Sequence, residues 1–303
     1  MNDTTPHTAD IVAAHAARFG AIVPPPVAFH AEHPVYRAAK QACMTLGFID
    51  TDAECLACAW HAQTVRTGRF DAQAWPGSPV DFGMRDFPPS TRSDAFAPCP
   101  ERLGLYAVLP DAAWVGRMAR AGVPTVQLRC KSADADAIQR EVVAAVQAVQ
   151  GTRALLFIND HWQAAIAAGA YGVHLGQEDL DALASENLER IRTAGLRLGV
   201  STHGYAEMVR ADRVSPSYVA MGAVFPTTLK QMATAPQGIA RLDAYARLLR
   251  GYPQVAIGGI DAERLPGVLA TGVGSVAMVR ALIAADDPEA TAARLATAIA
   301  SAH

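Results

Sequence analysis

Two aspartates are the first candidates for chemistry, because each closely follows a stretch that is typical of a buried strand. Asp160 comes after the apolar run 154–158, and Asp179 comes after the run 171–175. In a parallel α/β protein the carboxyl ends of successive strands lie on one face of the sheet, so the two carboxylates converge there. Two hard oxygen ligands at such a place favour a magnesium ion held for a phosphorylated substrate. Each aspartate taken alone is equally well explained as a helix cap or a turn residue.

A second group of polar side chains follows the preceding strand. Gln127, Arg129 and Lys131 alternate along the sequence, so an extended backbone places them on one side. Two cations beside an amide suit a polyanion such as pyrophosphate. A solvated strand end is the alternative interpretation of this segment.

Hydroxyl groups come next in the chain. Ser201 and Thr202 follow the fifth strand, where they could bind a substrate, cap the next helix, or do both. The segment 222–238 carries further hydroxyls and Lys230. Seventeen residues are long for a connection between a strand and a helix, so this segment is typical of a binding loop.

The last two strands are followed by a sequence that could bind phosphate. Gly258-Gly259 allows close backbone approach, and Val279-Arg280 stands where a helix begins. No Cys–His or Ser–His pair stands out as a nucleophile with its base. The set therefore favours a reaction driven by stabilising a phosphorylated leaving group.

The elements that must position these residues form a regular pattern from residue 103 onward. Short apolar strands alternate with alanine-rich helices in about eight units, which predicts a (β/α)8 TIM barrel with its active-site groups on the loops after the strands. The predicted strands cover 105–109, 125–129, 154–158, 171–175, 196–200, 218–222, 254–257 and 275–278. The main rival is an open doubly wound sheet, which is disfavoured because no Gly-x-Gly-x-x-Gly follows the first strand.

Residues 1–100 differ from the rest and predict a mainly helical extension, whereas 101–303 form the barrel. Helices are expected over 9–19, 35–46 and 52–66, the last with Thr51 or Asp52 as N-cap and Gly68 as its stop. The proline-rich segment 70–100 predicts an extended connector of unknown role.

A cysteine and histidine cluster in this extension admits two interpretations. Cys55, Cys58 and His61, with Cys43 upstream, have a spacing that suggests zinc. The spacing falls inside a helical pattern, however, and there free cysteines are usually small buried hydrophobes. We expect these cysteines to be part of the core.

The composition and net charge of the chain limit the classes of molecule that it is expected to bind. Of the 303 residues, 18% are charged, and the net charge is −3 without a block of like charge, so nucleic acid is not favoured. The N-terminus does not resemble a signal peptide, and we expect no membrane span. An odd number of cysteines, five, indicates reduced thiols and a cytoplasmic location.

An ordered series of motifs shows that residues 103–302 resemble thiamine-phosphate synthase, also called thiamine-phosphate pyrophosphorylase. The motifs are Gln-Leu-Arg-x-Lys at 127–131, Phe-Ile-Asn-Asp at 157–160, Gly-Val-His-Leu-Gly-Gln-Glu-Asp at 172–179, Gly-Val-Ser-Thr-His at 199–203, Phe-Pro-Thr-x-x-Lys at 225–230, Ala-Pro-Gln-Gly at 235–238 and Ile-Gly-Gly-Ile at 257–260. The resemblance implies a (β/α)8 transferase that joins a hydroxymethylpyrimidine diphosphate to a hydroxyethylthiazole phosphate, with Mg²⁺ as cofactor. Thiamine phosphate and pyrophosphate are the implied products.

The resemblance also implies a role for each matching residue. Asp160 and Asp179 would bind magnesium. Arg129, Lys131, Lys230 and Ser201 would be catalytic. The pyrimidine diphosphate would be held by Gln127, Leu128, Arg129, Cys130, Lys131, Asn159, Ser201 and Lys230, and the thiazole phosphate by Thr227, Thr228, Leu229, Gly258, Gly259, Val279 and Arg280.

Two positions depart from the family pattern, and both fall on the thiazole-phosphate half. Leu229 stands where the family usually has a threonine, and Arg280 where it usually has a serine. Two alternatives therefore accompany the synthase reading: an isomerase like the thiazole tautomerase, and a non-catalytic barrel that binds thiazole or thiamine phosphate. Arg129, Lys131, Asn159, Asp160 and Asp179 disfavour both, since a full set of diphosphate ligands would then have no evident use. A homo-oligomer is compatible with the sequence.

Overall fold

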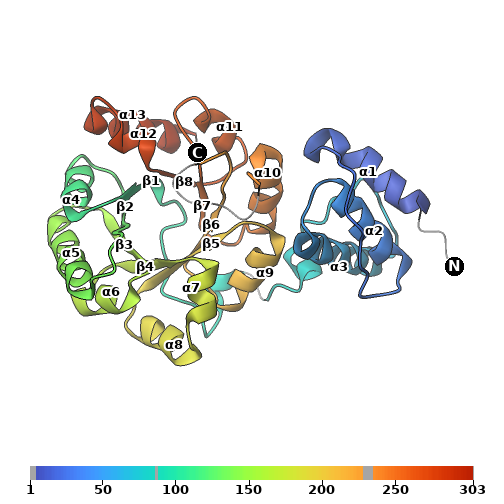
Figure 1. Ribbon diagram of the computed structural model, residues 1–303, viewed down its shortest axis with the longest axis horizontal. Coiled ribbons are helices and arrows are strands. Elements are labelled where there is room, and N and C mark those ends of the chain that lie inside the picture. Colours follow the sequence, from blue (N-terminus) through green and yellow to red (C-terminus); the bar gives the residue numbers. More distant parts are fainter. Residues whose placement is uncertain (1–4, 86–87, 228–234, 303) are drawn as a thin grey trace.

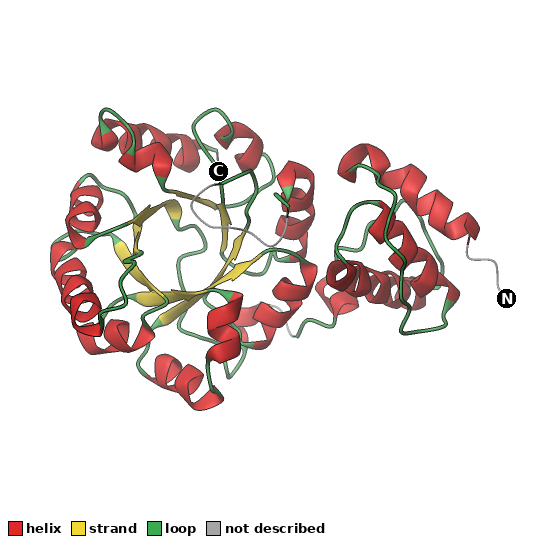
Figure 2. Ribbon diagram, viewed as in Figure 1, coloured by secondary structure: helices red, strands yellow, loops and turns green. Residues whose placement is uncertain are grey.

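The computed structural model describes residues 5–85, 88–227 and 235–302, and within them a closed parallel barrel adjoins a group of N-terminal helices (Figures 1 and 2). The strands pair in sequence order, and β8 closes the barrel on β1. They are β1 (Gly104–Leu109), β2 (Thr125–Leu128), β3 (Leu155–Asn159), β4 (Gly172–Leu175), β5 (Arg197–Thr202), β6 (Tyr218–Met221), β7 (Gln254–Ile257) and β8 (Ser275–Met278). The predicted (β/α)8 barrel is confirmed.

Helices surround the barrel, as Figure 2 shows in red around the yellow strands. They are α4 (Ala112–Arg120), α5 (Ala135–Ala148), α6 (Trp162–Ala168), α7 (Gln177–Ala182), α8 (Ser185–Thr193), α9 (Tyr205–Arg213), α10 (Gly238–Leu248), α11 (Leu265–Leu269), α12 (Arg280–Ile283) and α13 (Pro288–Ser301). In the described part of the chain, no helix combines the length and the apolar character that crossing a bilayer requires.

Alternating side chains along each strand supply the two layers of the core. On β3, Phe157 belongs to the apolar cluster inside the barrel, together with Tyr106 and Tyr218. The next residue, Ile158, belongs to the larger cluster that packs against the helices. Because both faces of a parallel barrel strand are buried, these strands are nearly continuous apolar runs, and this explains why they were predictable from the sequence.

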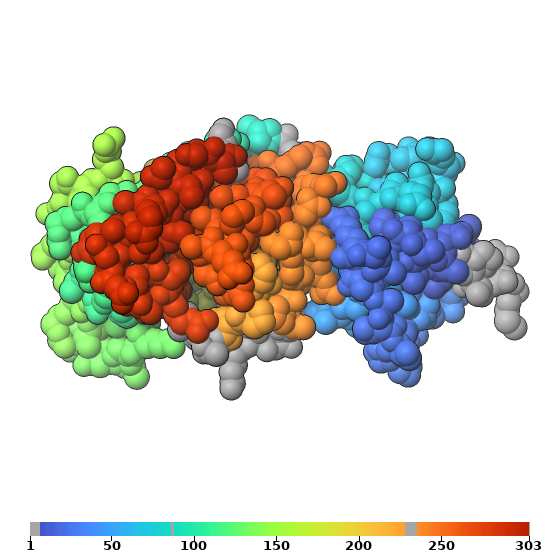
Figure 3. Space-filling model, turned by 90° about the horizontal axis from the view of Figure 1, so that it is seen from above, coloured from blue at the N-terminus to red at the C-terminus, as the bar shows by residue number. Residues whose placement is uncertain are grey.

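The N-terminal residues form α1 (Thr5–Phe19), α2 (Pro34–Thr45) and α3 (Asp50–Thr67). Seen from above, these helices lie at one end of the molecule, against the segment that includes α10 (Figure 3). The segment after α3 is not a plain extended connector as predicted. It contains two short 3₁₀ turns, η1 (Pro79–Phe82) and η2 (Pro89–Thr91).

Two predicted helix caps are wrong, and one helix stop is confirmed. Ile49, not Thr51 or Asp52, holds the N-cap position of α3. Strand β5 includes Ser201 and Thr202, and Gly204 is the N-cap of α9, so neither hydroxyl caps that helix. Gly68 ends α3 in the left-handed conformation, with φ of 76°, as expected of a C-terminal glycine.

The expectation that the extension's cysteines are all part of the core is wrong in part. Cys43 is fully buried, but Cys55 is partly exposed and Cys58 is exposed. Within the ranges that the structure describes, no group of three or more Cys, His, Asp or Glu side chains is arranged to bind a metal ion. The zinc alternative therefore gains no support from the described residues.

Candidate functional site

A hollow of about 560 Å³ lies at the mouth of the barrel, where the carboxyl ends of the strands meet. Its lining includes polar side chains and a glycine-rich stretch of backbone. The predicted residues that line it are Gln127, Arg129, Asn159, Asp160, Asp179, Ser201, Thr227, Gly258, Gly259, Val279 and Arg280. The barrel thus brings together side chains that are up to 153 positions apart in the sequence, from Gln127 to Arg280.

Some predicted site residues lie elsewhere. Leu128 is 1% exposed and faces the helix-side core. Strand β2 ends at Leu128, so the alternation that was expected to carry Lys131 to the same side as Gln127 stops before it. Lys131 is exposed, and neither it nor Cys130 lines the hollow. The predictions on Thr228, Leu229 and Lys230 lie outside the described residues.

Asp160 and Asp179 interact directly at one side of the mouth. Desolvation and the neighbouring charge of Asp179 raise the pKa of Asp160 to about 6. Asp160 has a left-handed backbone, with φ of 62°, and His161 takes the N-cap position of α6. The alternative interpretation of Asp160 as a helix cap is therefore wrong.

Asp179 does have a capping contact, because its Oδ2 accepts a hydrogen bond of 2.8 Å from the N–H of Gly176. A carboxylate offers several lone pairs, so this contact leaves capacity for a cation. Two carboxylates that repel each other fit Mg²⁺, which commonly takes one or two carboxylates and fills its other positions with water and phosphate oxygens. Asp160 and Asp179 are the residues that could hold it.

A line of buried hydrogen bonds runs inside the barrel and ends at Ser201. The amide nitrogen of Gln127 donates to the hydroxyl of Tyr106 over 3.1 Å, and Tyr106 and Tyr218 share a hydrogen bond of 2.7 Å. His174 connects this line to the mouth: its Nδ1 lies 2.7 Å from the hydroxyl of Tyr218, and its Nε2 lies 2.8 Å from Oγ of Ser201. Ser201 is thus held by a network, not by a helix terminus.

The opposite side of the mouth is built from backbone at close quarters. Gly258 and Gly259 have φ of 105° and 63°, and a Cβ atom at Gly259 would lie 2.6 Å from the carbonyl oxygen of Pro226. Glycine is therefore required for both the conformation and the approach. Val279 is the N-cap of α12, and its backbone and Arg280 complete this side.

The hollow is also lined by six polar residues to which the resemblance gave no role: His174, Glu178, Thr202, His203, Asp261 and Arg264. His174 lies in β4, and the alternation of side chains along this strand is the signal that could have placed it inside the barrel near the strand end. Arg264 donates to the carbonyl oxygen of Gly259 over 2.6 Å and lies over the ring of Phe225. Arg264 is the N-cap residue of α11, and its proximity to the glycine pair arises from the packed fold, which local sequence patterns do not indicate.

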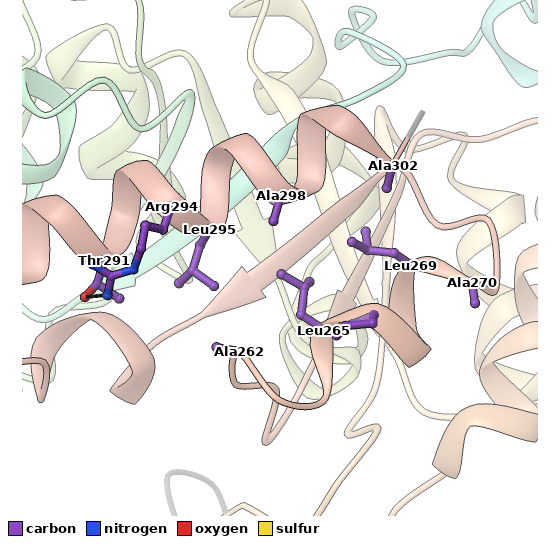
Figure 4. Close-up of a pocket in the computed structure, with 10 residues that line it drawn as sticks. Ala262, Leu265, Leu269, Ala270, Thr291, Arg294, Leu295, Ala298 and Ala302 are labelled. Atoms are coloured by element: carbon purple, nitrogen blue, oxygen red, sulfur yellow. Dashed lines mark hydrogen bonds between the residues drawn. The ribbon is translucent and has the colours of Figure 1, made fainter.

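A second hollow, of about 630 Å³, is larger but lies outside the barrel, between α11 and α13 (Figure 4). Its walls are mainly apolar and include Leu265, Leu269, Leu295 and Ala298. None of its lining residues belongs to the polar set at the mouth. The chemistry expected from the sequence is therefore associated with the smaller hollow.

Comparison with known proteins places the barrel in one family. Residues 105–282 match the family model described as thiamine monophosphate synthase. Thiamine-phosphate synthase of Neisseria meningitidis serogroup B is 57% identical over 195 residues, which are 64% of this chain and 94% of the relative; the enzyme of Yersinia pestis is 51% identical over 195 residues, which are 64% and 89%. Thiamine phosphate pyrophosphorylase from Pyrococcus furiosus matches the structure with a TM-score of 0.57 at 26% identity, over 66% of this chain and 96% of that one.

Proposed function

Because the chain belongs to the thiamine monophosphate synthase family, we propose that it is a transferase that makes thiamine phosphate. Its substrates are 4-amino-2-methyl-5-(diphosphooxymethyl)pyrimidine and hydroxyethylthiazole phosphate, and its second product is pyrophosphate. The observation that supports this best is the two-sided mouth of the barrel. An acidic pair with Arg129 stands on one side, and a glycine-lined backbone wall stands on the other.

The diphosphate is proposed to bind on the side of Asp160, Asp179 and Arg129. Asn159 and Ser201 line the same part of the hollow and supply an amide and a hydroxyl. The guanidinium of Arg129 pairs with phosphate oxygens and neutralises the charge that grows as the bond from carbon to oxygen breaks. Lys131 and Lys230 are proposed to add further positive charge, on the resemblance alone.

Asp160 and Asp179 are proposed to hold Mg²⁺. When bound, the ion supplies positive charge to the departing pyrophosphate. The chain's own contribution is to keep two carboxylates together at the strand ends, where burial and the neighbouring charge of Asp179 raise the pKa of Asp160.

Bond exchange at the pyrimidine completes the proposed reaction. Pyrophosphate leaves with the electron pair of the carbon–oxygen bond, and the electron-rich aminopyrimidine stabilises the cationic methylene carbon. The thiazole nitrogen then donates its lone pair to that carbon and forms the new bond. Positioning and charge stabilisation supply the catalysis, so no protein nucleophile is required.

The thiazole phosphate is proposed to bind to the backbone of Gly258, Gly259 and Val279, with Thr227 nearby. Arg280 replaces the serine usual in the family and adds a cation at this end of the hollow. Thr228 and Leu229 are assigned to the same half by the resemblance.

We further propose a cytoplasmic location, in keeping with five free cysteines, and residues 101–303 as the catalytic part of the chain. The partners are small molecules, and no nucleic acid or membrane is required. A homo-oligomer is compatible with this function.

One assay tests the proposal against its alternatives. The full chain is mixed with both substrates and Mg²⁺, and pyrophosphate and thiamine phosphate are measured, with a chelator as control. Equal amounts of the two products, lost on chelation, are expected. Conversion of a thiazole isomer alone would indicate the tautomerase-like reaction, and tight thiazole-phosphate binding without pyrophosphate would indicate a binding barrel.

A further inference from the structure

The N-terminal extension lies beside the two helices that follow β5 and β6, namely α9 and α10 (Figure 1). Residues 1–104 precede the segment that matches the family model, so the family resemblance gives them no role. Strand β5 carries Ser201 and Thr202, which line the hollow, and His203 follows them. A contact at the start of α9 is therefore a contact next to the site.

The start of α9 is capped by a side chain from the extension. The N-cap residue is Gly204, which has no side chain to satisfy the first N–H groups of the helix. Instead, Oδ1 of Asp52 in α3 accepts a hydrogen bond of 2.9 Å from the N–H of Ala206. Asp52 is 3% exposed, so this is a buried cap supplied from 154 residues away.

Gly204 and Asp52 fit each other closely. A Cβ atom at Gly204 would lie 2.1 Å from Oδ2 of Asp52, which is closer than any real contact. The carboxylate therefore occupies the space that an ordinary capping side chain at this position would use. An acidic group at the first turn also interacts favourably with the helix dipole.

Further contacts fix α3 against the barrel, so the cap is held firmly. Trp75 donates from its indole N–H to the hydroxyl of Tyr205 over 3.0 Å. Arg241 of α10 donates to the carbonyl oxygen of Gly47 over 2.7 Å, and its guanidinium lies 4.2 Å from the ring centroid of Phe48. These anchors lie on both sides of Asp52 in the sequence.

We propose that the extension positions the diphosphate side of the site, with Asp52 as the positioning residue that acts through the start of α9 on Ser201 and His203. This inference rests on the proposed function, because the affected ligand is the pyrophosphate of that reaction. Asp52 touches neither substrate nor metal. It fixes the position of the turn that joins β5 to α9.

The test compares two substitutions at one position in the full chain. Asp52→Ala removes the acceptor, whereas Asp52→Asn keeps an oxygen that can accept from Ala206. Pyrophosphate with Mg²⁺ is titrated into each variant, and kcat and KM are measured with both substrates. We expect Asp52→Ala to bind pyrophosphate about tenfold more weakly and to lose kcat/KM for the pyrimidine diphosphate by a similar factor. Asp52→Asn should recover most of both.

A matched control separates positioning from general weakening of the interface. Asp243 of α10 pairs with Arg18 of the extension over 2.7 Å, away from the start of α9. Asp243→Ala should lower stability while pyrophosphate binding stays unchanged. Folded Asp52→Ala with the pyrophosphate affinity and turnover of the unaltered chain would overturn the inference.

Hydrogen exchange on the unaltered chain gives a second measurement, which does not depend on Asp52→Ala folding. Pyrophosphate with Mg²⁺ should slow exchange at Ala206 and at the first turn of α3, and unchanged exchange in α3 would count against the inference. Failure of the proposed function is distinguishable, because then the unaltered chain itself would release no pyrophosphate from the two substrates.

Discussion

The hydroxyl of Ser201 is oriented by the direction of donation along the line of buried hydrogen bonds that ends at it. The amide nitrogen of Gln127 can only donate, so Tyr106 accepts there and directs its own proton to Tyr218. Tyr218 then donates to Nδ1 of His174, and the Nε2–H of His174 donates to Ser201. In this arrangement each proton along the line has an acceptor, and Ser201 would donate its own proton to the diphosphate proposed to bind in the hollow.

Tyr218→Phe should interrupt this line with little change in shape. His174 then loses the donor that fixes its tautomer, and Ser201 loses its fixed role as a donor. We expect kcat/KM to fall about tenfold, which corresponds to roughly one charge-assisted hydrogen bond. Steady-state kinetics with varied pyrimidine diphosphate would measure the change.

Tyr171→Phe is the matched control, because Tyr171 packs edge-on against Phe157 but lies outside the line from Gln127 to Ser201. It should keep normal kinetics. If Tyr218→Phe matched the unaltered chain in kcat/KM, the line of hydrogen bonds would have no part in placing Ser201.

The substitution Asp160→Ala tests the proposed role of this residue in binding magnesium. Removing one of two carboxylates should lower the rate by roughly 10²-fold or more, if the lost electrostatic group costs what such groups cost in other enzymes. The dependence of rate on Mg²⁺ concentration should also shift to higher concentration. Asp286→Ala, which removes an exposed carboxylate outside the hollow, is the control. Near-normal turnover of Asp160→Ala would contradict the role.

At the scale of elements, the buried cap of α9 makes stability depend on pH. Desolvation raises the pKa of Asp52 to about 6 from 3.8; Arg241 and the N–H groups of α9 oppose the shift, and Glu207 adds to it. The folded protein therefore binds this proton more tightly than the unfolded chain does. The stabilisation from the bound proton is fully present below the unfolded pKa and is lost as pH rises through about 6.

The prediction compares the unaltered chain with Asp52→Asn, which keeps an acceptor but does not titrate. The free energy of unfolding of the unaltered chain, less that of the variant, should fall by about 2.5 kcal/mol between pH 4 and pH 8. Urea unfolding at several pH values measures it, and the subtraction removes the titration of all other groups. A difference independent of pH would show that Asp52 keeps an ordinary pKa.

The same element shows what could be predicted from the sequence and what could not. Strand positions and the polar residues at their ends were predictable, because a barrel strand is a short apolar run and its side chains alternate locally. The cap of α9 was not, because local reasoning looks for the acceptor at Ser201 or Thr202. The actual acceptor, Asp52, is distant in the sequence and belongs to a helix whose own cap it was expected to be.

For the whole molecule, the family pattern covered the barrel but not its attachment to residues 1–100. The proline-rich segment was interpreted as a connector, yet the backbone N–H of Arg85 and the guanidinium of Arg92 both donate to Asp212 at the end of α9. Nothing in the spacing of those residues indicates a partner about 120 positions away. Such contacts depend on the packed fold, and packing is what a periodic pattern leaves undetermined.

The ion pair between Arg92 and Asp212 attaches the N-terminal extension to the barrel, and we expect it to stabilise the whole fold. Both side chains are nearly inaccessible, at 4% and 2% exposed, and Nη2 of Arg92 lies 2.7 Å from Oδ1 of Asp212. Tyr252 also donates to that oxygen over 2.7 Å. Arg92→Met leaves a buried carboxylate without its cation and should cost about 3–5 kcal/mol of stability. Urea unfolding followed by tryptophan fluorescence and by circular dichroism measures this loss.

The double variant Arg92→Met with Asp212→Asn should recover much of that loss, because the unpaired charge is then absent. Arg69→Met, which removes an exposed cation of the same extension, should change stability by less than about 0.5 kcal/mol. If Arg92→Met proved as stable as Arg69→Met, the pair would not hold the connector to the barrel. Coincident fluorescence and circular dichroism transitions in the unaltered chain are also expected, since the extension and the barrel share this buried contact and should unfold together.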